Sequence, residues 1–265
     1  MKALINGNVM AFDDVGAGPA VLLLHGFPLS RRVWEPQVGP LVDAGFRVIV
    51  PDLRGFGESA VPEEGYDMNT FADDIVALMN YLGVGRAVVG GMSMGGYVLL
   101  DLLARYPQRL NAAMFLVTRA AADDAAGREK RTALAAAVAG GDLLVVPEAF
   151  SGVLFAPQTP AEKPALVAEV RGWMEQTSPQ GLIGGLMAIR DREDCSALVA
   201  KLDLPALVLG ADADNAIPLA ESQNLAAELP QATLVTLAGG GHMVNLEQPE
   251  AFNQALLDFL VTLPG

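Results

Sequence analysis

Apolar residues in this sequence gather in short unbroken runs, and segments with helical spacing separate one run from the next. Buried parallel strands have such continuous apolar runs, because helices cover both faces of the sheet. The alternation of strand and helix therefore predicts an α/β domain built on a mostly parallel, doubly wound sheet. The predicted strands are residues 21–24, 46–50, 87–91, 112–117, 206–210 and 232–237.

Residue types that start and end helices mark some of the segments between these strands. Thr70 is suited to cap a helix that ends near Gly83. Residues 248–263 predict an amphipathic helix after the last strand. The opening residues 1–12, MKALINGNVMAF, predict an antiparallel hairpin with NGN at its turn.

The alternation breaks between residues 118 and 204, where Ala-rich and proline-bounded helical segments replace the buried strands. This stretch is too long for a connection, since loops inside compact domains rarely exceed about 15 residues. We therefore predict a core domain of residues 1–117 and 205–265, with residues 118–204 as a helical cap. The cap is either a lid over a functional site or an elaboration that only adds stability.

Charge and hydropathy narrow the kinds of partner. Lys and Arg number 17 against 31 Asp and Glu, for a formal net charge of −14. This surplus argues against nucleic acid and anionic membranes. The amino-terminal segment lacks the apolar stretch of a signal peptide, and no apolar stretch reaches the roughly 18 residues of a membrane span. We expect a cytoplasmic monomer or homodimer that acts on a small molecule.

The single cysteine, Cys195, rules out an internal disulfide and fits a reducing compartment. It has no histidine near it in the sequence, so we expect no catalytic role for its thiol. The sequence has no Cys/His cluster of the kind that binds zinc, and we expect neither a metal nor an organic cofactor.

A serine stands where the strand at 87–91 turns into a helical segment, in the sequence GMSMG of residues 91–95. Strand, G-x-S-x-G and helix together form a nucleophile elbow, whose tight turn exposes the Ser93 hydroxyl at the edge of the sheet. The glycines keep Cβ atoms away from the strand and helix. The motif alone also occurs by chance, as a glycine-rich turn with an incidental serine.

A serine needs a base to act as a nucleophile at neutral pH, and the chain has two histidines. His242 lies in a glycine-rich loop after the last predicted strand, with no apolar periodicity to explain it. His25 ends the first apolar run and is expected to be structural. The position of His242 and the small number of histidines therefore favour His242 as the base.

The base needs an acid that holds its tautomer, and the loop after residues 206–210 offers Asp212 and Asp214. Asp214 stands four residues before Pro218, which favours it, but Asp212 stays open and either could be a turn aspartate. Two backbone N–H groups, of Phe27 and Met94, are expected to form an oxyanion hole.

Taken together, these motifs resemble the α/β-hydrolase superfamily over nearly the whole chain. The stretches that carry the resemblance are LLLHGFPLSRRVW, VIVPDLRGFGES, GADADNAIP and GGGHMVNLEQPEAF, besides the elbow. The resemblance implies an eight-stranded sheet with a cap inserted after the sixth strand. It also implies Ser93, His242 and Asp214 as a catalytic triad, with Phe27 and Met94 as oxyanion donors. The D-x-R-G-x-G-x-S loop that begins at Asp52 is interpreted as structural.

The chain departs from the family pattern at the acid. Gly210 and Asp214 are one residue further apart than the common G-x-x-D spacing, which is why Asp212 stays open. No carboxylate stands at Thr118, where some relatives carry the acid. A serine nucleophile speaks against dehalogenases and epoxide hydrolases.

Within the superfamily the chain is most similar to bacterial carboxylesterases and oxoadipate enol-lactonases. The resemblance implies hydrolysis of esters of small to medium acyl chains through an acyl-enzyme on Ser93. Alternative reactions with the same triad are lactone hydrolysis, carbon–carbon bond hydrolysis and perhydrolysis. Changes near Leu29 could shift the reaction from hydrolysis to perhydrolysis. A further alternative is a ligand-binding protein of this fold without catalytic activity. The candidate substrate-pocket residues are Leu29, Trp173, Met174 and Met187. The alternative interpretation is that these side chains are part of the hydrophobic core.

Overall fold

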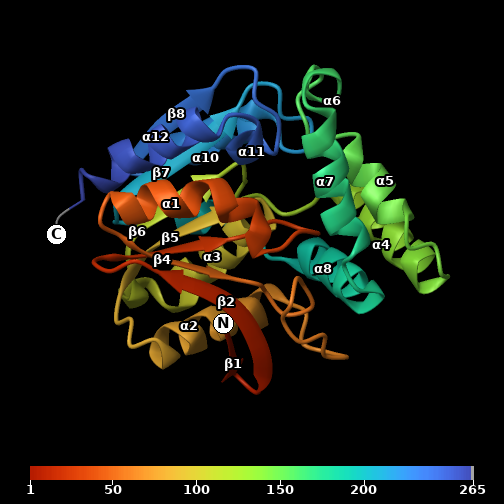
Figure 1. Ribbon diagram of the computed structural model, residues 1–265, viewed down its shortest axis with the longest axis horizontal. Coiled ribbons are helices and arrows are strands. Elements are labelled where there is room, and N and C mark those ends of the chain that lie inside the picture. Colours follow the sequence, from red (N-terminus) through yellow and green to blue (C-terminus); the bar gives the residue numbers. More distant parts are fainter. Residues whose placement is uncertain (264–265) are drawn as a thin grey trace.

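A single sheet organises the chain. The computed structural model describes residues 1–263, and its eight strands lie in the order β1-β2-β4-β3-β5-β6-β7-β8 (Figure 1). The β1–β2 and β2–β4 pairs are antiparallel, and the remaining pairs are parallel. The strands are β1 (Lys2–Ile5), β2 (Asn8–Val15), β3 (Ala20–Leu24), β4 (Arg47–Pro51), β5 (Ala87–Met92), β6 (Leu110–Leu116), β7 (Ala206–Ala211) and β8 (Ala232–Leu237). The predicted fold class is confirmed.

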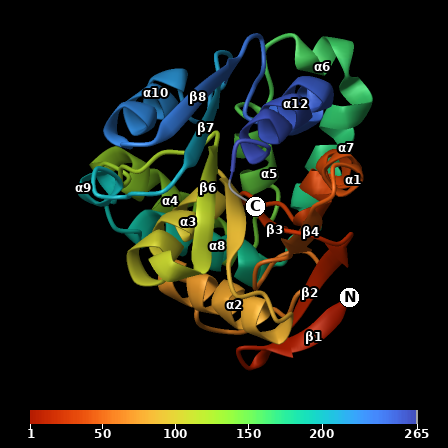
Figure 2. The ribbon, with the colours of Figure 1, turned by 90° about the vertical axis from the view of Figure 1, so that its left-hand side faces the viewer.

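Helices cover both faces of the sheet (Figures 1 and 2). Alternate residues of β3 enter two separate cores: Leu22 and Leu24 pack toward α2, α3 and α10, and Val21 and Leu23 toward α1 and α12. Two-sided burial accounts for the unbroken apolar run of this strand. These helices are α1 (Glu35–Asp43), α2 (Met68–Tyr81), α3 (Met94–Arg105), α10 (Leu219–Glu228), α11 (Val244–Glu247) and α12 (Pro249–Leu260), with 3-10 turns at Arg31–Trp34 and Pro107–Arg109.

The predicted hairpin at the amino terminus is present. Ile5 pairs with Asn8, so the turn consists of Asn6 and Gly7. Both have positive φ, 46° and 79°, which is the conformation of the two-residue turns that match strand twist.

Helix α2 corrects one prediction. Its cap is Asp67, whose Oδ1 accepts a hydrogen bond from the Thr70 N–H at 2.7 Å. Thr70 therefore lies in the first turn as a donor, because the carboxylate three residues earlier is the better partner for a free N–H group. The closing helix, α12, ends at Leu260 and not at residue 263.

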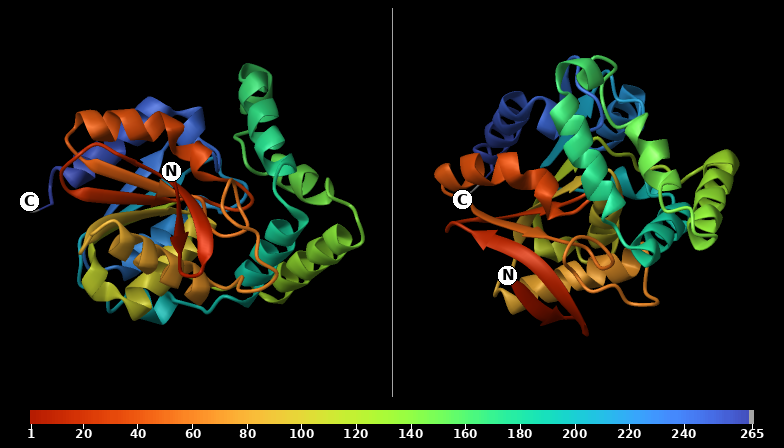
Figure 3. Two further views of the ribbon diagram at one scale, coloured as in Figure 1. Left: turned by 60° about the horizontal axis from the view of Figure 1, so that its bottom comes forward. Right: turned by 45° about the vertical axis from the view of Figure 1, so that its right-hand side comes forward.

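The segment between β6 and β7 contains only helices, and α4 to α8, here called the cap helices, stand to one side of the sheet (Figures 1 and 3). They are α4 (Ala125–Ala139), α5 (Val145–Ser151), α6 (Thr159–Glu162), α7 (Pro164–Glu175) and α8 (Pro179–Asp191), followed by α9 (Ser196–Val199). The division of the chain into core and cap domains stays a prediction.

Among residues 1–263, no helix is long and apolar enough to cross a membrane.

Candidate active site

Ser93 lies at the sharp turn between β5 and α3, with φ 53° and ψ −117°. A non-glycine residue with positive φ is strained, and its neighbours must leave room for the turn. A Cβ added at Gly91 would lie 2.3 Å from the Gly95 carbonyl oxygen, and one at Gly95 would lie 2.2 Å from the Leu24 oxygen. The glycines around Ser93 are therefore required by the close approach of β5, α3 and the end of β3.

Two hydrogen bonds to the end of β6 hold this turn. The Ser93 N–H donates to the Leu116 carbonyl at 3.1 Å, and the Thr118 hydroxyl donates to the Ser93 carbonyl at 2.9 Å. A Cβ at Gly96 would lie 2.4 Å from the Thr118 hydroxyl oxygen. Sequence reasoning noted Thr118 only as a position without a carboxylate, whereas its hydroxyl fixes the serine turn.

His242 and Asp214 are in direct contact. The Nδ1–H of His242 donates to Asp214 Oδ2 at 2.7 Å, and the two side chains are 4% and 0% exposed. The other carboxylate oxygen accepts the N–H groups of Ala216 and Ile217 at 2.8 and 2.9 Å. These backbone donors orient the carboxylate, so that Asp214 fixes both the tautomer and the direction of the imidazole ring.

Asp212, the other candidate acid, is exposed and bonds elsewhere. Its Oδ1 accepts the Gly239 N–H at 2.6 Å, which ties the loop after β7 to the loop after β8. Ser93, Asp214 and His242 follow β5, β7 and β8, strands that lie within one parallel block of the sheet. The three residues therefore emerge at the same edge of the sheet, and their catalytic roles stay a prediction.

The loop after β3 runs beside Ser93. A Cβ added at Gly26 would lie 3.2 Å from the Ser93 Cβ and 3.8 Å from its Oγ. Phe27 comes next, with its ring packed edge-on against Phe56 and Phe150. Within residues 1–263, the backbone N–H groups of Phe27 and Met94 donate to no protein acceptor, so both are free to bind a ligand oxygen.

His25, at the start of this loop, is completely buried. Its Nε2 accepts the Leu53 N–H at 3.0 Å, and its Nδ1–H donates to the Gly26 carbonyl at 2.9 Å. Burial lowers the pKa of His25, against the opposing effect of the Asp52 carboxylate. The ring is therefore neutral and joins two loops.

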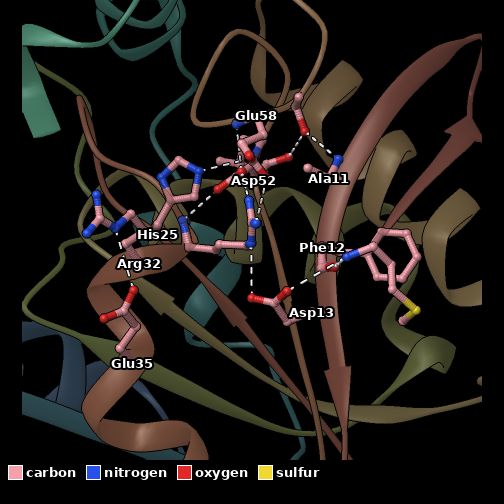
Figure 4. Close-up of polar contacts among 12 residues, drawn as sticks. Ala11, Phe12, Asp13, His25, Arg32, Glu35, Asp52 and Glu58 are labelled. Atoms are coloured by element: carbon pink, nitrogen blue, oxygen red, sulfur yellow. Dashed lines mark hydrogen bonds and ion pairs between the residues drawn. The ribbon is translucent and has the colours of Figure 1, made fainter.

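An ion network centred on the buried Asp52 lies at the far end of the loop after β3 (Figure 4). Asp52 accepts the Arg31 and Glu58 N–H groups at 2.7 and 2.8 Å and also pairs with the Arg31 guanidinium. The same guanidinium bonds Asp13 at 3.0 Å and Glu58 at 2.8 Å. Burial lowers the pKa of Arg31, but these carboxylates raise it by more. The pKa therefore lies above its ordinary value, and Arg31 stays a cation.

Glu247 is a buried carboxylate that sequence reasoning missed. One oxygen accepts the Gly241 N–H at 2.8 Å, next to His242, and the other accepts the Ala156 N–H at 2.8 Å. Glu247 thus connects the loop that carries His242 to the segment before α6. The only signal was its place in the family-like stretch GGGHMVNLEQPEAF.

The four predicted pocket residues do not line one cavity. Leu29 and Trp173 line a hollow of about 470 Å³ with several charged side chains, and Met187 lines another of about 210 Å³ that includes Cys195. Met174 is fully buried in the core between the cap helices and the sheet. Ser93 is not among the residues that line either hollow.

The thiol of Cys195 is far from reactive, because burial raises its pKa to about 11. In the part of the chain that the structure describes, no group of three or more His, Cys, Asp or Glu side chains is arranged to hold a metal ion.

Comparison with known proteins agrees with this architecture. A family model described as alpha/beta hydrolase fold matches residues 19–249. The AB hydrolase superfamily protein YisY of Bacillus subtilis is 31% identical over 93% of both chains. A thermophilic esterase from Thermogutta terrifontis superposes with a TM-score of 0.95 at 35% identity, over 99% of this chain and 98% of the esterase. The enol-lactonase of Burkholderia xenovorans has a TM-score of 0.92 at 26% identity, over 98% and 100%.

These relatives support a hydrolase activity. The chain belongs to the α/β-hydrolase family.

Proposed function

We propose that the protein is a serine hydrolase that cleaves carboxylic esters through Ser93, His242 and Asp214. The observation that carries this proposal is the 2.7 Å hydrogen bond from His242 to the buried Asp214, at the sheet edge where the strained Ser93 turn stands. A base held by an oriented carboxylate, at the same sheet edge as a serine, is the arrangement that activates a hydroxyl.

In this mechanism Asp214 keeps the proton on Nδ1, so Nε2 takes the proton of the Ser93 hydroxyl as its oxygen attacks the ester carbonyl. The carbonyl oxygen becomes an oxyanion that accepts the free N–H groups of Phe27 and Met94, at the start of α3. When the intermediate collapses, the imidazolium gives its proton to the leaving alcohol. A water activated by the same histidine then attacks the acyl-enzyme and releases the acid.

Two observations narrow the substrate class: the side chains around the loop after β3, and the similarity of the chain to known enzymes. The Phe27 ring of this loop and the Phe150 ring of α5 are apolar and in contact, which favours the acyl group of a small to medium ester. The 35% identity to an esterase supports ester hydrolysis, and the superposition on an enol-lactonase supports lactones as a second substrate class. Both reactions use the same acyl-enzyme.

A graded series of aryl esters, from acetyl to longer acyl chains, tests the proposal with wild type and Ser93→Ala. Wild type should prefer short chains, and the variant should lose about 10⁴-fold or more in kcat. Ser196→Ala, at the start of α9, is the matched control and should keep full activity. Equal ester turnover by wild type and Ser93→Ala would refute the triad. Activity on lactones alone would assign the second class.

A further inference from the structure

Contacts from three cap segments converge on Phe27 and Pro28, in the loop after β3. The Thr177 hydroxyl, between α7 and α8, donates to the Pro28 carbonyl at 2.9 Å. Phe150 of α5 packs its ring edge-on against the Phe27 ring, with centroids 5.3 Å apart. The third contact comes from Gly185 of α8.

Gly185 brings the backbone of α8 directly against the Phe27 ring. A Cβ added there would lie 2.6 Å from Phe27 Cδ2 and 2.8 Å from the Phe56 ring. Glycine in a helix interior is destabilising relative to alanine, so helix formation does not account for Gly185. The close approach does, because no other residue leaves room for the Phe27 ring at this distance.

The core contacts this loop at its two ends and at the Phe27 ring, which packs edge-on against Phe56. His25 bonds to Leu53 at the start, and Arg31 bonds to Asp52 at the far end. Between them stand Phe27 and Pro28, whose side chain and carbonyl are contacted by the cap. The position of the Phe27 backbone therefore depends on the cap contacts as well as on the packing of its ring against Phe56.

We propose that Thr177 and Gly185 are positioning residues, which hold the Phe27 N–H where the oxyanion forms. This inference rests on the proposed serine hydrolase function. The cap then contributes to the rate of the chemical step as well as to the enclosure of substrate. A displacement of about 1 Å in a catalytic group can cost about 100-fold in rate, so a shift of the ring that moves the backbone is measurable.

The first test is Thr177→Val, which keeps the shape of the side chain and removes its hydroxyl. We expect kcat for an aryl ester to fall about fivefold, with KM changed less than about twofold, because the oxyanion contact belongs to the transition state. Thr262→Val is the control, since that hydroxyl bonds the Phe259 carbonyl of α12, outside the cap. Equal kcat in Thr177→Val and wild type would overturn the role of Thr177.

The second test is Gly185→Ala, whose methyl group collides with the Phe27 ring. We expect kcat to fall about 30-fold with little change in KM. Gly172→Ala in α7 is the control, because a Cβ at Gly172 meets nothing within 4 Å. The double variant Gly185→Ala with Phe27→Leu should regain part of the lost kcat, since leucine keeps the N–H and removes the colliding ring edge.

A further measurement separates positioning from general loosening of the cap. A trifluoromethyl ketone forms a tetrahedral adduct with the serine and places an oxyanion in the hole. Its affinity should weaken in proportion to kcat/KM across Thr177→Val and Gly185→Ala. Lost kcat with unchanged ketone affinity would overturn the inference. An active Ser93→Ala enzyme would instead overturn the triad itself.

Discussion

The two histidines of this chain are both buried, yet their surroundings differ. His25 has each ring nitrogen bonded to a neutral backbone group, the Leu53 N–H and the Gly26 carbonyl. His242 has one nitrogen bonded to the carboxylate of Asp214. A ring between neutral partners is held in place and uncharged, whereas a carboxylate partner stabilises the imidazolium that forms when the base takes a proton. The charge of the partner, and not burial, separates the structural histidine from the one proposed as the base.

The largest expected effect is loss of the His242–Asp214 pair. His242→Ala and Asp214→Asn should each lower kcat by about 10⁴-fold, because the first removes the base and the second stabilises the wrong tautomer. The free energy of unfolding, measured in urea, should change far less than for a core deletion. Ester turnover within tenfold of wild type in either variant would break the comparison.

For His25 the expected loss is in stability. His25→Ala leaves the buried Leu53 N–H without an acceptor and opens a cavity, which should lower the free energy of unfolding by about 3 kcal/mol. Urea unfolding measures this loss, and kcat of the folded variant should stay far above that of His242→Ala. If His25→Ala lost as much kcat as His242→Ala while remaining folded, the two histidines would not differ as proposed.

The sequence predicts more of the sheet than of its surroundings, for a physical reason. Runs such as residues 87–91 and 206–210 are apolar on both faces, and a short run of that kind fits a strand covered by helices on each side. The Ser93 turn is also visible locally, in the motif G-x-S-x-G, although Gly95 makes room for the distant end of β3. The choice between Asp212 and Asp214 is not local, because it depends on which carboxylate meets His242, 28 residues further along the chain.

Contacts between distant segments escape sequence reasoning in the same way. Glycine at position 185 indicates a close approach to α8, but not that the approaching group is the Phe27 ring. Thr118 bonds to the Ser93 backbone and Glu247 accepts the Gly241 and Ala156 N–H groups, and neither residue type signals these contacts. The N-cap residue of α2 is Asp67 and not the predicted Thr70. Both residue types are suitable at that end of the helix, so the sequence alone does not decide between them.

The pH dependence of stability is a smaller expected effect, and it tests whether His25 is neutral in the folded protein. Burial holds the pKa of His25 below its ordinary 6.5, so the unfolded chain takes up this proton at a higher pH than the folded chain. Stability is therefore lost as pH falls below about 6.5, by up to about 1.4 kcal/mol per pH unit from this group. Urea unfolding between pH 7.5 and 5.5 should show a shallower slope for His25→Ala; identical slopes would contradict a neutral buried His25.

The smallest expected effect belongs to Asp212→Asn. The asparagine oxygen can still accept the Gly239 N–H, so the loop connection survives the loss of charge. We expect kcat within about twofold of wild type and a change in unfolding free energy below about 0.5 kcal/mol, as for most exposed positions. The same chemical change at Asp214 removes the carboxylate that faces His242. Comparing the same substitution at these two positions of one loop therefore tests whether the partner of a carboxylate decides its role. A large loss of kcat in Asp212→Asn would show that the charge of the loop matters beyond the contact with His242.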